Sequence, residues 1–177
     1  CYVMERQKIE QTEIDSAVKF SLGFPMGIFE LADFTGLDVI HKATMEMHVR
    51  DKKVILPHPT IEKLFNEKNL GQKSGQGFYK YSDDKYERIP LSEELAKKCE
   101  PTQIVANVLN NAAWLITNNA SDIDEIEKAA KLGLGLKKPL FETANEIGMK
   151  KIVEELKKLS DKHGAFYEPD PLLLSMC

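Results

Sequence analysis

Two stretches of this chain, EIDSAVKFSLGFPMGIFELADFTGLD (residues 13–38) and EIEKAAKLGLGLKKPLFETANEIGMK (residues 125–150), align without a gap at a spacing of 112 residues. Ten of the 26 aligned positions are identical, where ordinary residue frequencies would give about one or two. The register continues to the Pro57/Pro59 pair, which falls on Pro169/Pro171. The sequence is therefore a tandem duplication, and its 177 residues are predicted to form two units, 1–90 and 91–177.

The composition excludes several classes of function. The chain is 42% hydrophobic and 29% charged with a net charge of -4, so it has no basic field that would attract nucleic acid. No apolar run approaches the roughly 18 residues that span a bilayer, so no membrane partner is expected. Three widely spaced cysteines, Cys1, Cys99 and Cys177, favour a reducing cytoplasmic location over a disulfide framework or a zinc site.

Helical spacing of apolar residues dominates both units and strand alternation is nearly absent, so the predicted fold class is all-α. In the first unit, the predicted helices cover residues 2–9, 12–20, 28–34, 37–48 and 60–67. Thr12 and Asp15 are predicted to cap the second of these in the manner of a capping box. The glycine-rich residues 71–81 are expected to form a turn with a short strand, followed by a polar linker over residues 82–94.

The second unit repeats this order, with predicted helices over residues 103–118, 122–132, 141–146, 149–162 and 172–174. The helix beginning near Gln103 starts before the counterpart of Cys1. We therefore expect the first unit to lack its opening turns and the chain to be part of something longer.

Three motifs in order carry a family resemblance: EIDSAVKFSLGFPMGIFELADFTGLDV (13–39), HPTIEKLFNEKNLGQK (58–73) and KSGQGFYKY (73–81). With them, the first unit resembles the C-terminal domain of L-3-hydroxyacyl-CoA dehydrogenases. The second, more divergent unit resembles the duplicated copy found in longer, multifunctional members. The fold implied is two tandem helical units similar to the C-terminal domain of 6-phosphogluconate dehydrogenase.

The resemblance implies NAD-dependent oxidation of 3-hydroxyacyl-CoA to 3-oxoacyl-CoA in fatty-acid β-oxidation. In that family, an N-terminal Rossmann domain binds NAD and carries the catalytic His–Glu pair. No GxGxxG follows a predicted strand here, so this chain is expected to bind no cofactor and to be inactive alone. Its implied task is to complete the acyl-CoA pocket beside that Rossmann domain and to mediate association. The two units are expected to pack about a pseudo-twofold axis, and a homo-oligomer is a further expected partner.

The resemblance places the FPMG turn beside the acyl end of the substrate. The predicted substrate-binding residues are Phe24, Pro25, Met26 and Phe29. The alternative interpretation is an ordinary corner between helices. In each unit a phenylalanine, Phe29 or Phe141, is expected to anchor a helix in the core, and a glutamate, Glu30 or Glu142, to cap or bridge backbone amides. The corresponding turn of the second unit, residues 136–139, carries two lysines that would spoil an apolar wall, so that copy is expected to serve packing.

His41 and His48 lie seven residues apart on one predicted helix, and without further ligands at metal-ligand spacing they are expected to be partly exposed helix histidines. His58 lies in an extended loop and His163 at a helix end, and none of the four is expected to be catalytic. We expect all four to be structural, and no metal to be bound. A function of another class also fits the sequence: a stand-alone helical module that binds a partner or an acyl-CoA without catalysis.

Overall fold

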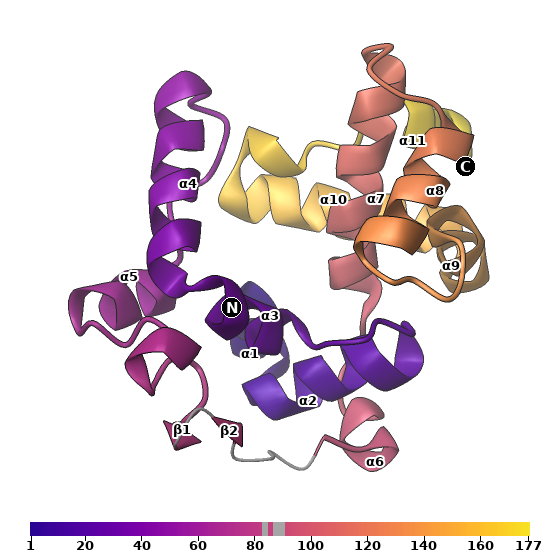
Figure 1. Ribbon diagram of the computed structural model, residues 1–177. Helices are drawn as coiled ribbons and strands as arrows, with labels where there is room; N and C mark the ends of the chain where they lie inside the picture. Colours follow the sequence, from indigo (N-terminus) through magenta and orange to yellow (C-terminus); the bar gives the residue numbers. More distant parts are fainter. Residues whose placement is uncertain (83–84, 87–90) are drawn as a thin grey trace. The chain divides into compact units, whose positions relative to one another are not determined.

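The all-α prediction is confirmed by the computed structural model, which describes residues 1–82, 85–86 and 91–177 (Figure 1). Within these residues the only strands are β1 (Tyr81–Ser82) and β2 (Lys85–Tyr86), which pair antiparallel. The described residues divide into two compact units, Cys1–Ser21 with Met26–Cys99, and Leu22–Pro25 with Glu100–Cys177. The predicted boundary at residue 90 and part of the predicted linker lie outside the described residues.

The first unit is built from several short helices and one longer helix. They are α1 (Tyr2–Gln7), α2 (Gln11–Ser16), the π-helix η1 (Ala17–Ser21), α3 (Ile28–Thr35), α4 (Leu37–Arg50), α5 (Pro59–Asn66), the 3-10 turn η2 (Gln72–Ser74) and α6 (Glu93–Ala96). Helix α3 packs on α2 and α4, and α6 covers α2 and η1. The buried apolar side chains of this unit include Ile14, Val18, Phe29, Leu37 and Tyr79.

The predicted cap of α2 is wrong. Helix α2 begins after Glu10, and the capping box pairs Glu10 with Glu13, whose Oε2 accepts the Glu10 N–H at 2.8 Å. Thr12 therefore lies inside the helix, and Asp15 is fully buried with partners far along the chain. A local capping pattern was overridden by a tertiary contact of Asp15.

The second unit packs three helices on α7 (Thr102–Thr117). Its other elements are α8 (Ile123–Gly133), α9 (Leu140–Ile147), α10 (Met149–His163), the 3-10 turn η3 (Ala165–Tyr167) and α11 (Pro171–Ser175). Helices α9, α10 and α11 contact α7, and Leu109, Ile152, Leu156 and Leu173 are fully buried between them. None of the helices in the described part of the chain combines the length and apolarity needed to cross a membrane.

The duplication recurs in the backbone and in the helix caps. Gly36 and Gly148, which join α3 to α4 and α9 to α10, have φ values of 100° and 98°. The imidazole of His58 accepts the Thr60 N–H at the start of α5, as the Asp170 carboxylate accepts the Leu172 N–H at the start of α11. Each cap also contacts the helix that opens its unit: His58 Nε2 lies 3.1 Å from Glu5 of α1, and Thr117 of α7 donates to Asp170 at 2.6 Å.

A second repeated device joins neighbouring helices through a carboxylate. Asp15 accepts the N–H groups of Phe29 and Glu30 at 2.9 and 3.0 Å, at the start of α3. At the equivalent position, Glu127 accepts the N–H groups of Leu140 and Phe141, both at 2.8 Å, at the start of α9. The glutamate is one methylene longer and binds one residue earlier, so the same closure of the turn is retained. The first N–H groups of a helix have no partner within the helix, and a carboxylate satisfies them and the positive end of the helix dipole.

Replacing Glu127 with alanine removes both acceptors at the start of α9. Because the N–H groups of Leu140 and Phe141 lose their partners, we expect the free energy of unfolding to fall by about 1–2 kcal/mol. Urea titration followed by circular dichroism measures this change, with Glu154→Ala, an exposed glutamate of α10, as the matched control. Equal unfolding midpoints for the two variants would show that Glu127 is not a stabilising cap.

Candidate functional site

The four predicted substrate-binding residues are divided between the two units. Phe24 and Pro25 belong to the second unit, whereas Met26 and Phe29 belong to the first. Met26 is exposed, Phe24 is half-buried, and Pro25 packs on Gly135. Phe29 is buried in the core, where its ring centre lies 4.5 Å from that of Phe78. Each unit therefore holds two of the four predicted residues, and their role in substrate binding stays a prediction.

Phe24 lines a small apolar hollow in the second unit. The lining residues are Leu22, Phe24, Ile104, Val105, Val108, Leu136, Leu140 and Thr143. Its volume is about 10 Å³, which is room for about one water molecule. An acyl chain does not fit there without displacing the core, so we interpret this hollow as a packing defect.

Met26 lines a much larger hollow in the first unit, of about 230 Å³. The other lining residues are Glu30, Phe34, Gln72 and Tyr81. The side chain of Phe34 is 67% exposed and that of Met26 37%, so two large apolar groups stand open to solvent here. Exposed apolar groups gathered at one hollow are typical of a site that binds an apolar ligand.

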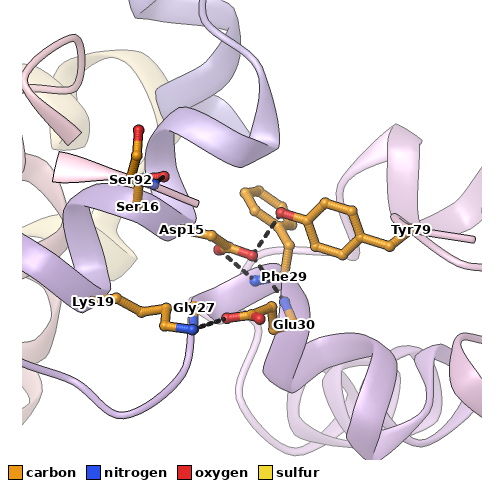
Figure 2. A network of polar contacts seen from close by, with 8 residues as sticks. All are labelled: Asp15, Ser16, Lys19, Gly27, Phe29, Glu30, Tyr79 and Ser92. Atoms are coloured by element: carbon orange, nitrogen blue, oxygen red, sulfur yellow. Dashed lines mark hydrogen bonds and ion pairs between the residues drawn. The ribbon is translucent and has the colours of Figure 1, made fainter. Parts of the chain in front are cut away.

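A buried polar network holds the start of α3, directly after Met26 in the sequence (Figure 2). Asp15 is completely buried and accepts the hydroxyl of Tyr79 at 2.8 Å in addition to its two backbone donors. Glu30 accepts the N–H of Gly27 at 2.7 Å and lies 3.5 Å from Lys19 Nζ. The expectation that Glu30 caps backbone amides is thereby confirmed. The end of the turn that leads into α3 is thus held by two buried carboxylates.

Gly27 is required by close approach of the backbone to the Asp15 carboxylate. A Cβ added at this position would lie 2.2 Å from Asp15 Cγ, which is far inside van der Waals contact. In the second unit, the corresponding residue is Pro139, and Glu127 reaches the helix by its longer side chain. The residue at this corner therefore depends on which carboxylate closes it.

A second buried aspartate carries the glycine-rich segment. The Asp33 carboxylate accepts the N–H groups of Phe78 and Tyr79 and the hydroxyl of Tyr81, each at 2.9 Å. A Cβ at Gly77 would lie 2.1 Å from Asp33 Oδ1, so only glycine lets the segment lie this close to α3. The result is that Tyr81 lines the hollow and the stretch 71–77 folds onto α3 rather than forming a phosphate loop.

Burial changes the acidity of both aspartates. Removal from water raises the pKa of Asp15 from its ordinary 3.8 to about 6, against the opposing effect of its three hydrogen bonds. The negative charge of Glu30 adds to the rise. Burial likewise raises the pKa of Asp33, and its hydrogen bonds from Phe78, Tyr79 and Tyr81 oppose the rise.

Sequence reasoning missed both aspartates as organisers of the site. Asp15 was assigned to the cap of its own helix, and Asp33 was given no role. The signal that could have identified them was polarity at a core position, since both lie in step with the buried residues of their helices, such as Ile14 and Phe29. Among the described residues, no group of three or more His, Cys, Asp or Glu side chains is placed to hold a metal ion.

The pKa of Asp15 has a consequence for stability that Asp15→Asn isolates, because asparagine does not titrate. A pKa raised on folding means that the folded chain binds a proton between about pH 4 and pH 6. The stability that Asp15 contributes below this window is lost as the pH rises through about 6, by about 3 kcal/mol in total. We expect the unfolding free energy of the wild-type chain, minus that of the variant, to fall by this amount from about pH 4 to pH 7. Urea denaturation across this range measures it, and parallel pH profiles for the two proteins would contradict it.

Comparison with known proteins assigns the chain to a family. The family model described as 3-hydroxyacyl-CoA dehydrogenase, C-terminal domain, matches residues 1–81 and 102–177. Mitochondrial hydroxyacyl-coenzyme A dehydrogenase of Homo sapiens is 42% identical over 79 residues, which are 44% of this chain and 25% of that protein. A probable 3-hydroxyacyl-CoA dehydrogenase of Caenorhabditis elegans is 42% identical over 79 residues, 44% of this chain and 26% of that protein. The chain thus spans about a quarter of the length of these relatives.

Solved structures show the same fold over nearly the whole chain. The 3-hydroxybutyryl-CoA dehydrogenase from Escherichia coli K12 matches 99% of this chain and 56% of its own, with a TM-score of 0.75 and 18% identity. The dehydrogenase part of multifunctional enzyme 1 from Caenorhabditis elegans matches 98% of this chain and 45% of its own, with a TM-score of 0.65 and 20% identity. At these identities the likeness concerns the fold, whereas the family match extends over the sequence of both units. The chain belongs to the family of 3-hydroxyacyl-CoA dehydrogenase C-terminal domains.

Proposed function

We propose that this chain is the C-terminal part of an NAD-dependent 3-hydroxyacyl-CoA dehydrogenase that oxidises 3-hydroxyacyl-CoA to 3-oxoacyl-CoA in fatty-acid β-oxidation. Its family and the activity named for its human relative support this assignment. The observation that carries the proposal is the open apolar hollow at Met26. The task of the chain is to complete the acyl-CoA pocket and to mediate association.

The Met26 hollow has the chemistry of an acyl-chain site. Met26, Phe34 and the ring of Tyr81 supply apolar surface, and each methylene buried against such surface contributes about 0.8 kcal/mol. The thioether of methionine adapts to chains of different shape. Glu30 brings no unpaired charge to the hollow, because the Gly27 N–H and Lys19 occupy its carboxylate.

The proposed reaction needs groups that the described residues do not supply. Oxidation of a secondary alcohol requires a base near neutral pH beside a nicotinamide, and NAD supplies the hydride acceptor. No histidine lines the Met26 hollow. The residues present also do not fit NAD, since the glycines of stretch 71–77 pack on Asp33 and a two-stranded hairpin is not a dinucleotide fold. We assign the base and the NAD site to an N-terminal Rossmann domain of the parent enzyme, without which this chain is inactive.

Helix α4 is the proposed association surface. Val39, Met47 and Val49 are 48%, 54% and 62% exposed along it. Sedimentation velocity tests this proposal. A chain that stays monomeric at all concentrations would contradict it. The pseudo-twofold packing of the two units and the cytoplasmic location stay predictions, and the human relative is named as mitochondrial.

Replacing Met26 with glutamate puts a carboxylate into the apolar wall and tests the acyl site. We expect the affinity for octanoyl-CoA, measured by isothermal titration calorimetry, to fall about tenfold or more, because the carboxylate must lose water when the chain binds. Met176→Glu is the matched control, since Met176 is 40% exposed in the second unit and does not line the hollow.

Two results would contradict the proposal. Equal affinities of the Met26 and Met176 variants would place the acyl chain elsewhere. Formation of NADH by this chain alone, with NAD and 3-hydroxybutyryl-CoA, would show that it carries its own catalytic machinery.

A further inference from the structure

A third hollow lies in the second unit at the turn between α8 and α9. Its volume is about 280 Å³, and it is lined by Glu127, Lys128, Lys131, Leu136, Lys137, Lys138 and Pro139. Four of the seven lining residues are lysines, in a chain whose net charge is -4. Positive charge is thus concentrated at one concave place on a chain that is acidic as a whole.

Three of the four lysines have no acidic partner among the described residues. Lys138 is paired with Glu146 and lies 3.7 Å from Glu142. Lys128, Lys131 and Lys137 are exposed, and no ion pair within the described ranges involves them.

The one acid in the lining is already engaged. Both carboxylate oxygens of Glu127 accept backbone N–H groups at the start of α9. Glu127 therefore lowers the positive potential of the hollow but leaves its lysines unpaired.

Comparison of the two units shows why Lys131 has no acidic partner. Lys131 corresponds to Lys19, which lies 3.5 Å from Glu30 in the first unit. The counterpart of Glu30 is Glu142, which lies beside Lys138 instead.

The other three lysines are specific to the second copy. Lys137 and Lys138 occupy the positions of Pro25 and Met26, and Lys128 that of Ser16. The same turn is therefore apolar in the first unit and basic in the second.

The arrangement suits a phosphate. Lys128 and Lys131 are one helical turn apart on α8, so they share a face, and Lys137 comes from the turn that follows. Like charges around one hollow repel each other, and a multiply charged anion offsets this repulsion. Lysine is a flexible point charge that binds phosphate without a fixed geometry. Leu136 and Pro139 give the hollow an apolar floor.

We propose that the hollow at Lys128, Lys131 and Lys137 binds a multiply charged phosphate group, either a diphosphate or a phosphate monoester. A single carboxylate would neutralise only one of the three lysines, whereas a phosphate group of this kind balances two or more. The site does not depend on the acyl site at Met26, which belongs to the other unit.

Titration of the full chain with inorganic pyrophosphate at low ionic strength tests the site. We expect saturable binding in calorimetry, and a loss of affinity of about tenfold or more in the double variant Lys131→Ala/Lys137→Ala. The matched control is Lys150→Ala/Lys157→Ala, which removes two exposed lysines of α10 and should change the affinity by less than about twofold. Circular dichroism verifies that both variants fold.

Titration with a second ligand, coenzyme A, distinguishes which kind of phosphate compound binds. If coenzyme A binds with the same dependence on Lys131 and Lys137, the site takes the phosphates of a nucleotide cofactor. If pyrophosphate binds but coenzyme A does not, the site takes a small phosphate metabolite. Both results support the site. Absence of saturable pyrophosphate binding, or an equal loss of affinity in the two double variants, overturns it.

Discussion

A carboxylate that reaches from one helix to the first N–H groups of the next is the contact on which both units depend. Asp15 makes it in the first unit and Glu127 in the second. Without it, two backbone donors at the start of a short helix would be buried with no partner, at a cost of about 1–3 kcal/mol each. The same contact sets the direction in which the helix leaves the turn. Phe29 then points into the core, and Met26 remains at the surface.

The two copies keep this scaffold and differ in what is attached to it. In the first unit, Asp33 binds the Phe78–Tyr81 segment to α3 through three hydrogen bonds. In the second unit, the corresponding residue is Asn145, which is exposed. The capping role of Glu30 has also been lost, because Pro139 has no N–H to give to Glu142. One fold thus carries an apolar turn in one copy and a basic turn in the other.

The type and order of the longer helices could be predicted from the sequence, because the period of apolar residues is a local signal. The four-residue helix α6 and the π-helix η1 could not, because such short segments carry too few residues to show a period. The caps could not. Thr12 is a better N-cap by propensity than Glu10. Glu10 nevertheless opens α2, because Glu13 accepts its N–H and Asp15 is held by the start of α3. The division of Phe24 and Met26 between two hollows could not be predicted either. It depends on where the chain passes from one unit to the other, and no local sequence pattern indicates that position.

The duplicated caps at His58 and Asp170 make the same bond with different acceptors. The His58 ring accepts the Thr60 N–H on Nδ1 and has Nε2 beside Glu5, so one imidazole joins the start of α5 to α1. The Asp170 carboxylate accepts the Leu172 N–H and the hydroxyl of Thr117, so one carboxylate joins the start of α11 to α7. In each copy, the loss of a single side chain would therefore free a helix start and also detach it from the helix that opens its unit.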